Sequence, residues 1–258
     1  MAEAIRHLTN GLKVLNGLPQ GSERLQRELD LQLALGRASI AAKGFAAPET
    51  GSAYARAREL CHELGATPEL FPVLYCQSVF YFQRGELAEA HRIAWELLRL
   101  GKQRGDDAAQ LTGHRMIGGA LYLLGRFTES RDALEQALAL YDPARDRASA
   151  VVYAIDSRAM CKSWLAHLYL ILGDPERAIA LDGEVPAYVR EVSNPSTEAL
   201  ALAWGCIFRQ LLRDQQSAQD QAEAVIALAT EQGFPLYRAA GVAVRGWAHA
   251  VEAILQHL

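Results

Sequence analysis

Cysteines and histidines are the residues that could make this chain an enzyme or a metal protein. The four cysteines stand far apart in apolar helical patterns, at Cys61, Cys76, Cys161 and Cys206. None belongs to a CxxC pair or has a histidine at metal-ligand spacing, and the chain contains no GxSxG or HExxH motif. We therefore expect no catalytic residue, no metal and no cofactor, and we expect buried cysteines in a reducing compartment.

Histidines and tryptophans are the remaining candidates for ligand contacts. His114 and His167 lie in helical patterns, where a groove contact and an ordinary hydrogen-bonded role are both open. The tryptophans are spread over the chain at helical positions, which favours packing in the core or between helices over a ligand cage. They are Trp95, Trp164, Trp204 and Trp247.

Charge and hydropathy argue against two classes of partner. The 258 residues include 26 basic and 30 acidic side chains, and no basic run exceeds two residues, so no nucleic-acid interface is expected. No apolar run reaches the about 18 residues that a membrane span needs. The N-terminus lacks the basic flank and the small-residue cleavage site of a signal peptide. These features predict a cytoplasmic protein with no nucleic-acid partner and no membrane partner.

A repeated outline provides the framework that must position any binding residues. Its reference positions stand 40, 48 and 40 residues apart, at Gly85, Gly125, Gly173 and Arg213. Small residues recur seven positions before and five positions after them. The former are Ser78, Gly118, Ala166 and Cys206, and the latter are Ala90, Ser130, Ala178 and Ala218. A glycine turn between two helices would bring these small residues face to face, which predicts closely packed antiparallel helix pairs.

The fold class that follows is all-α, a right-handed superhelical stack of antiparallel helix pairs forming one repeat domain over residues 1–258. The predicted pairs are 22–42 with 48–63, 67–84 with 86–103, 106–124 with 126–141, 146–172 with 175–192, and 196–212 with 214–232. Single helices are expected at 3–16 and 236–256. The apolar faces of these end helices predict self-association through Ile5, Leu8, Leu12 and Leu15 or through Val244, Trp247, Val251 and Leu255.

Two segments depart from the regular outline. Gly183 to Pro186 predict a break or bend in the helix that begins near Pro175, because proline removes a backbone donor. The 48-residue repeat predicts an unbroken helix over 146–172, about two turns longer than its neighbours. Its extension would place Tyr153, Asp156 and Met160 over the mouth of a groove, or it would merely cover an irregular loop.

The first helices of stacked pairs are expected to line the concave surface. The candidate groove residues on them are Tyr75, Phe82, Arg115, Tyr122, Ser163 and His167. This mixed aromatic and polar lining suits an extended peptide, a helix or a small ligand. The alternative for each apolar member is packing against the next repeat.

Two resemblances extend this interpretation. The outline resembles the tetratricopeptide repeat (TPR), with longer helices, at Gly118, Leu121, Tyr122, Gly125, Ser130, Leu134 and Ala137. Longer blocks, among them "GSERLQRELDLQLALG", "KGFAAPETGSAYARARELCHELG" and "IALATEQGFPLYRAAGVAVRGWAHA", resemble the C-terminal repeat region of bacterial signalling proteins. In those proteins a class III adenylate/guanylate cyclase domain is followed by an ATPase domain of the AAA/STAND type. The resemblance implies a fragment of a larger multidomain protein.

The resemblance implies a sensing or interaction arm, because nucleotide chemistry belongs to the upstream domains. This chain has no GxxxxGK[ST] phosphate loop and no acidic metal-binding pair of a cyclase. The sequence therefore predicts a non-catalytic regulatory module that binds a protein segment in its concave groove. The alternative is a repeat domain that senses a small molecule and controls the upstream cyclase or ATPase.

Overall fold

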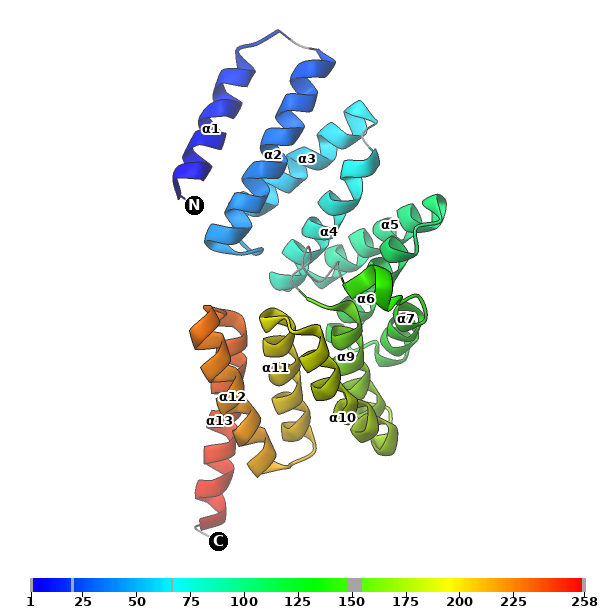
Figure 1. Ribbon diagram of the computed structural model, residues 1–258, viewed down its shortest axis with the longest axis vertical. Coiled ribbons are helices and arrows are strands. Elements are labelled where there is room, and N and C mark those ends of the chain that lie inside the picture. The colour runs from blue at the N-terminus through cyan, green and yellow to red at the C-terminus, as the bar shows by residue number, and fades with distance from the viewer. Residues whose placement is uncertain (1, 20, 66, 148–154, 257–258) are drawn as a thin grey trace. The chain divides into compact units, whose positions relative to one another are not determined.

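The computed structural model describes residues 2–19, 21–65, 67–147 and 155–256, and this part of the chain consists of helices joined by short connections (Figure 1). It divides into two compact units, Met1–Gly125 (unit 1) and Arg126–Leu258 (unit 2). Unit 1 contains α1 (Ala2–Asn16), α2 (Ser22–Lys43), α3 (Pro48–Leu64), α4 (Thr67–Gln83), α5 (Leu87–Arg104) and α6 (Asp107–Leu123). Unit 2 contains α7 (Phe127–Ala139), α9 (Ser157–Ile171), α10 (Pro175–Val192), α11 (Pro195–Leu211), α12 (Gln215–Gln232) and α13 (Pro235–Gln256). The fold is all-α, as predicted.

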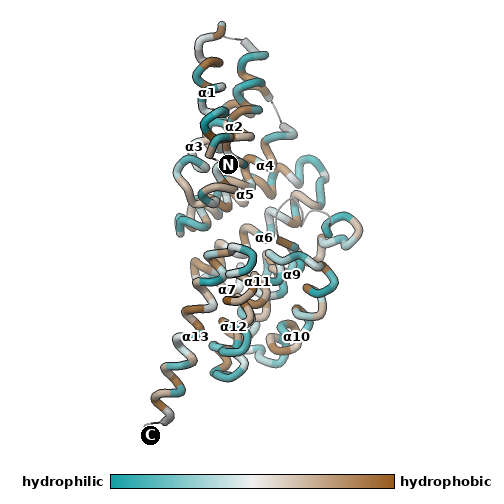
Figure 2. Tube along the Cα trace, turned by 60° about the vertical axis from the view of Figure 1, so that its left-hand side comes forward, coloured by the Kyte–Doolittle hydropathy of each residue, from teal (hydrophilic) through white to brown (hydrophobic). Residues whose placement is uncertain are grey.

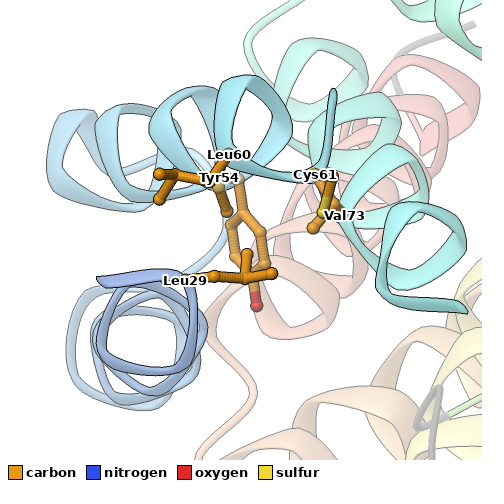
Figure 3. Close-up of a cluster of buried hydrophobic side chains, with 6 residues drawn as sticks. Leu29, Tyr54, Leu60, Cys61 and Val73 are labelled. Carbon is orange, nitrogen blue, oxygen red and sulfur yellow. The ribbon is translucent and has the colours of Figure 1, made fainter. Parts of the chain in front are cut away.

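In unit 1 each helix packs against the next one along the chain, from α1 to α6. A cluster at the start of this unit joins α2, α3 and α4 through Leu29, Tyr54, Leu60 and Val73 (Figure 3). Gly36 of α2 makes this approach possible, because a Cβ atom there would lie 2.6 Å from the Tyr54 ring. Close packing of neighbouring helices is therefore what buries the apolar residues of the repeat.

Unit 2 has the same kind of packing, with α9 against α10 and α11 and with α12 against both α11 and α13. Its C-terminal core contains Cys206 of α11, Val225 of α12 and Val244 of α13, each almost fully buried. In Figure 2 apolar and polar segments alternate along α13, as expected for a helix that covers a neighbour on one side.

The repeat positions behave as the sequence predicts. The reference residues have positive φ angles, 74° at Gly85, 74° at Gly125, 91° at Gly173 and 61° at Arg213. All eight small residues around them are buried, and the Ser78 hydroxyl donates to the main-chain carbonyl of Ala90, 3.2 Å away, across a helix pair. Arginine in the left-handed region costs about 1 kcal/mol more than glycine. Arg213 thus keeps the turn at some cost.

One local prediction is wrong and a second is wrong in part. The helix predicted over 146–172 is not continuous, because Ile155 is in a bend, Asp156 is extended and α9 begins at Ser157. Tyr153 lies outside the described residues. A break or a bend was predicted near Gly183; the break is absent, since α10 runs from Pro175 to Val192 with Pro186 inside it, and the bend stays a prediction. Proline removes one hydrogen bond, and burial of neighbouring apolar side chains on α10 keeps the helix intact.

The end helices bury part of the faces that were expected to associate. Leu15 of α1 and Val244 of α13 are buried within their own units, so their predicted exposure is wrong. The other predicted residues whose burial is described are half-buried, namely Ile5, Leu8, Leu12, Trp247 and Val251, and self-association through them stays a prediction. The more exposed apolar side chains on these helices are Val14, Leu236, Val242 and Ile254. Self-association through Leu15 and Val244 would require unpacking of α1 or α13.

Candidate functional site

Two of the predicted groove residues meet inside unit 1. The Arg115 guanidinium of α6 lies 5.9 Å from the centre of the Tyr75 ring of α4, within the range of a cation–π contact. Burial raises the pKa of Tyr75, and the neighbouring Arg115 opposes that shift. Both side chains are buried. Their positions favour the alternative that they hold successive first helices together.

Phe82 of α4 and Tyr122 of α6 are only half-buried. Burial raises the pKa of the Tyr122 hydroxyl. These two residues retain the partly open position that a groove lining needs. Their role in binding stays a prediction.

The predicted groove residues of α9 belong largely to the core of unit 2. His167 packs against Trp204 and Phe208 of α11, with ring centres 5.3 and 5.5 Å away, and donates through Nε2 to the Trp204 carbonyl at 2.9 Å. Burial lowers the pKa of His167 to about 4, so the ring is neutral at pH 7. Ser163 is buried as well and donates to the Ala159 carbonyl within the same helix, whereas Met160 is half-buried.

Asp156 has a structural position that the sequence did not reveal. Its fully buried carboxylate accepts hydrogen bonds from the Tyr141 hydroxyl at 2.9 Å and from the Ala159 amide at 2.9 Å, which caps α9. Its own amide donates to the Thr197 hydroxyl of α11 at 3.0 Å. Because Tyr141 gives its one hydroxyl proton to Asp156, Tyr188 of α10 donates to the Tyr141 oxygen at 2.7 Å.

Arg158 completes this group, which we call the Asp156 cluster and define as Tyr141, Asp156, Arg158, Tyr188 and Thr197. The Arg158 guanidinium lies 5.0 Å from the Tyr188 ring centre and 5.8 Å from that of Tyr141. The cluster joins the segment after α7 to α9, α10 and α11. The sequence did contain a signal for the start of α9, because an aspartate such as Asp156 often caps the first turn of a helix. The prediction of one long helix through this position overlooked that signal.

The most exposed aromatic feature of unit 1 lies on α5. Trp95 is 50% exposed, so its predicted burial in the core or between helices is wrong. The Trp95 indole N–H donates to His91 Nε2 at 3.1 Å, which fixes the orientation of the ring. Arg99 and Lys102 follow at helical spacing on the same surface hollow. We call Trp95, Arg99 and Lys102 the α5 face.

Positive charge on the α5 face is not balanced nearby. Glu96 lies between its members but accepts from the Arg58 guanidinium at 2.5 Å. Arg92 is paired with Glu89 at 2.5 Å. Among the described residues, no ion pair includes Arg99 or Lys102. The helical spacing of Trp95, Arg99 and Lys102 could have been read from the sequence, but the exposure of the Trp95 side chain could not.

The part of the chain that the structure describes contains neither a metal-binding group of side chains nor a membrane-spanning helix. No group of three or more histidine, cysteine, aspartate or glutamate side chains is arranged to hold a metal ion there. Within the same residues, no helix combines the length and the apolar character that crossing a membrane requires.

Comparisons with known proteins identify the fold. No protein-family model matches the sequence, and no curated protein matches it either. Among solved structures, RapI in its apo form shares 11% identity, with 96% of this chain and 90% of that chain covered and a TM-score of 0.65. BtubC from P. vanneervenii shares 15%, with 90% and 91% covered and a TM-score of 0.59.

A third structure is described as a kinesin light chain of Podosopora anserina with nearly identical TPR-like repeats. It shares 18% identity, with 83% of this chain and 99% of that chain covered, and its TM-score is 0.54. Together with the helix pairs and their glycine turns, these similarities show a TPR-like helical repeat. The identities are low enough that the similarity concerns the fold alone.

Proposed function

We propose that this chain is a non-catalytic protein-interaction module that binds an acidic protein segment. The observation that carries this proposal is the α5 face, where a half-exposed tryptophan stands beside two cations that no described carboxylate neutralises. Tryptophan and arginine are the residue types that contribute most to protein–protein binding energy.

Each part of the α5 face has a separate role in this binding. The Trp95 ring offers apolar area for an aliphatic or aromatic side chain and is held by His91, so little side-chain entropy is lost when a partner binds. Arg99 and Lys102 attract carboxylates and speed the encounter with an acidic partner. A helical peptide with an apolar residue and acidic residues at i+3 or i+4 matches this spacing.

The finer part of the proposal concerns the groove and the regulatory context. Phe82, Tyr122 and Met160 are the predicted groove residues that are described and not buried, and we propose that they contact a protein segment within their own units. The similarity of the quoted sequence blocks to cyclase–ATPase signalling proteins supports a bacterial, cytoplasmic module that regulates such upstream domains.

Peptide binding tests the α5 face directly. A fluorescein-labelled helical peptide with one leucine and three glutamates should bind the protein, and Trp95 fluorescence should change on binding. The double variant Arg99→Glu with Lys102→Glu should weaken binding about tenfold or more, and added salt should weaken binding to the unaltered protein.

The matched control places the same charge change elsewhere. Lys13 of α1 and Arg238 of α13 are exposed, and Lys13→Glu with Arg238→Glu should leave peptide affinity unchanged. The α5 proposal fails if this control and the variant at Arg99 and Lys102 weaken binding equally, or if a lysine-for-glutamate version of the peptide binds as tightly.

A further inference from the structure

A small recess in unit 2 lies among α10, α11 and α12, on helices that the groove prediction did not include together. Its volume is about 190 Å³. Apolar side chains form much of the wall, namely Val185, Pro186 and Val189 of α10 with Ala201 and Leu202 of α11. Pockets for drug-sized ligands usually hold about 300–1,000 Å³, so this recess has room for one small molecule or side chain.

The recess contains a buried acceptor that no described donor satisfies. Oε1 of Gln221, on α12, is buried and has no hydrogen-bond partner among the described residues. Gly205 of α11 makes room for it, because a Cβ atom at that position would lie 2.7 Å from this oxygen. Buried polar atoms are nearly always hydrogen-bonded, so an unsatisfied acceptor beside a recess can take a hydrogen bond from a donor that enters it, either water or a ligand.

Asp182 of α10 adds further acceptors to the same recess. Its side chain is 11% exposed, and Oδ2 accepts from the Arg209 guanidinium at 2.5 Å, while no described residue donates to Oδ1. Pro186 has no N–H, so the main-chain carbonyl of Asp182 also lacks its usual helical donor. Burial raises the pKa of Asp182, and Arg209 opposes that shift. The interior of the recess therefore offers acceptors and calls for donors.

Two charged side chains of opposite sign stand at the exposed edge of the recess. Arg190 of α10 and Glu198 of α11 both line it. Neither forms an ion pair with a residue that the structure describes. Arg190 is thus available to bind a carboxylate of a ligand, and Glu198 is available to bind a cationic group.

We propose that this recess binds a small aliphatic α-amino acid. The ammonium group donates to Gln221 Oε1 and to the Asp182 carboxylate, and the aliphatic side chain lies against Val185, Val189 and Leu202. The α-carboxylate pairs with Arg190. This site is independent of the α5 face and would make the chain a sensor of a small molecule in addition to a protein-binding module.

Calorimetric titration with L-leucine tests the proposal, with two analogues that each lack one charged group. L-leucine should bind saturably, whereas isoamylamine, which has no carboxylate, and 4-methylpentanoate, which has no amine, should each bind about tenfold more weakly. Isoamylamine binding as tightly as leucine would overturn the assignment of an amino acid, and the absence of saturable leucine binding would overturn the site.

Variants locate the binding in the recess. Gln221→Leu and Gly205→Ala should each weaken leucine binding about tenfold, the first by removing the acceptor and the second by displacing it. Gln216→Leu makes the same change on the exposed side of α12 and should leave binding unchanged. Arg190→Gln, at an exposed position, should weaken leucine binding without altering helix content. Equal binding by Gln216→Leu and Gln221→Leu would place the ligand elsewhere.

Discussion

The Asp156 cluster and the recess around Gln221 are two polar regions of unit 2 that share helices α10 and α11 but differ in hydrogen bonding. Asp156 is fully buried, and its amide and both carboxylate oxygens have partners. Gln221 Oε1 is buried and has none among the described residues. A satisfied buried group stabilises the fold, whereas an unsatisfied one destabilises it until a donor arrives. The difference separates a structural site from a proposed binding site without reference to residue type.

The largest expected effect is that of removing the Asp156 carboxylate. Asp156→Ala leaves the Tyr141 hydroxyl and the first turn of α9 without their acceptor, so unfolding free energy should fall by about 3 to 4 kcal/mol. Urea unfolding measures this. Asp174→Ala is the matched control, since Asp174 caps α10 at an exposed position through one bond to the Arg177 amide and should cost about 1 kcal/mol. Equal losses would contradict a special role for the cluster.

The next effect concerns pH, because burial disfavours the protonated form of His167, and the hydrogen bond to the Trp204 carbonyl offsets this only in part. Its pKa is about 4 in the folded protein against 6.5 when unperturbed, so the unfolded chain binds the proton more readily. The stability that this provides is complete above pH 6.5 and is lost as pH falls towards about 4, a total of about 3 kcal/mol.

Unfolding in urea across this pH range gives the measurement. His167→Gln keeps a donor for the Trp204 carbonyl but does not titrate, and its stability should therefore fall less steeply between pH 6.5 and 4. If the unfolding free energy of the two proteins changed with pH at the same rate, the pKa of His167 would not differ between the folded and unfolded chains.

A smaller effect distinguishes the two tyrosines of the Asp156 cluster. Tyr141→Phe removes the donor to a buried carboxylate and should cost about 2 kcal/mol, because hydrogen bonds to charged groups are the stronger kind. Tyr188→Phe removes only a bond between two hydroxyl groups and should cost about 1 kcal/mol. Thermal unfolding of both variants measures the two losses. A larger loss for Tyr188→Phe than for Tyr141→Phe would contradict the assignment of Tyr141 as the donor to Asp156.

The smallest effect is expected in the recess. Gln221→Leu removes an acceptor that has no described partner, so unfolding free energy should change by less than about 1 kcal/mol and in the stabilising direction. A loss greater than that would show that Gln221 is bonded in the free protein and would erase the difference from Asp156.

Short-range spacing was sufficient to predict most of the fold. The positions of Gly85, Gly125, Gly173 and Arg213 are fixed by the need for a left-handed turn at the end of a helix. The small residues around them had to be buried because two helices approach closely there. Both requirements act within one helix pair, so the local sequence carries them.

The sequence by itself therefore determined the helix pairs, their turns and their seams. Only the tertiary structure decided which polar and aromatic residues are exposed, because that depends on side chains from helices far away in the chain. Trp95 and Trp164 have similar helical surroundings in sequence, yet Trp164 packs against Trp204 of α11 and Trp95 is left half-exposed. Likewise, Gln221 became an unsatisfied acceptor only because Gly205 of another helix leaves space for it.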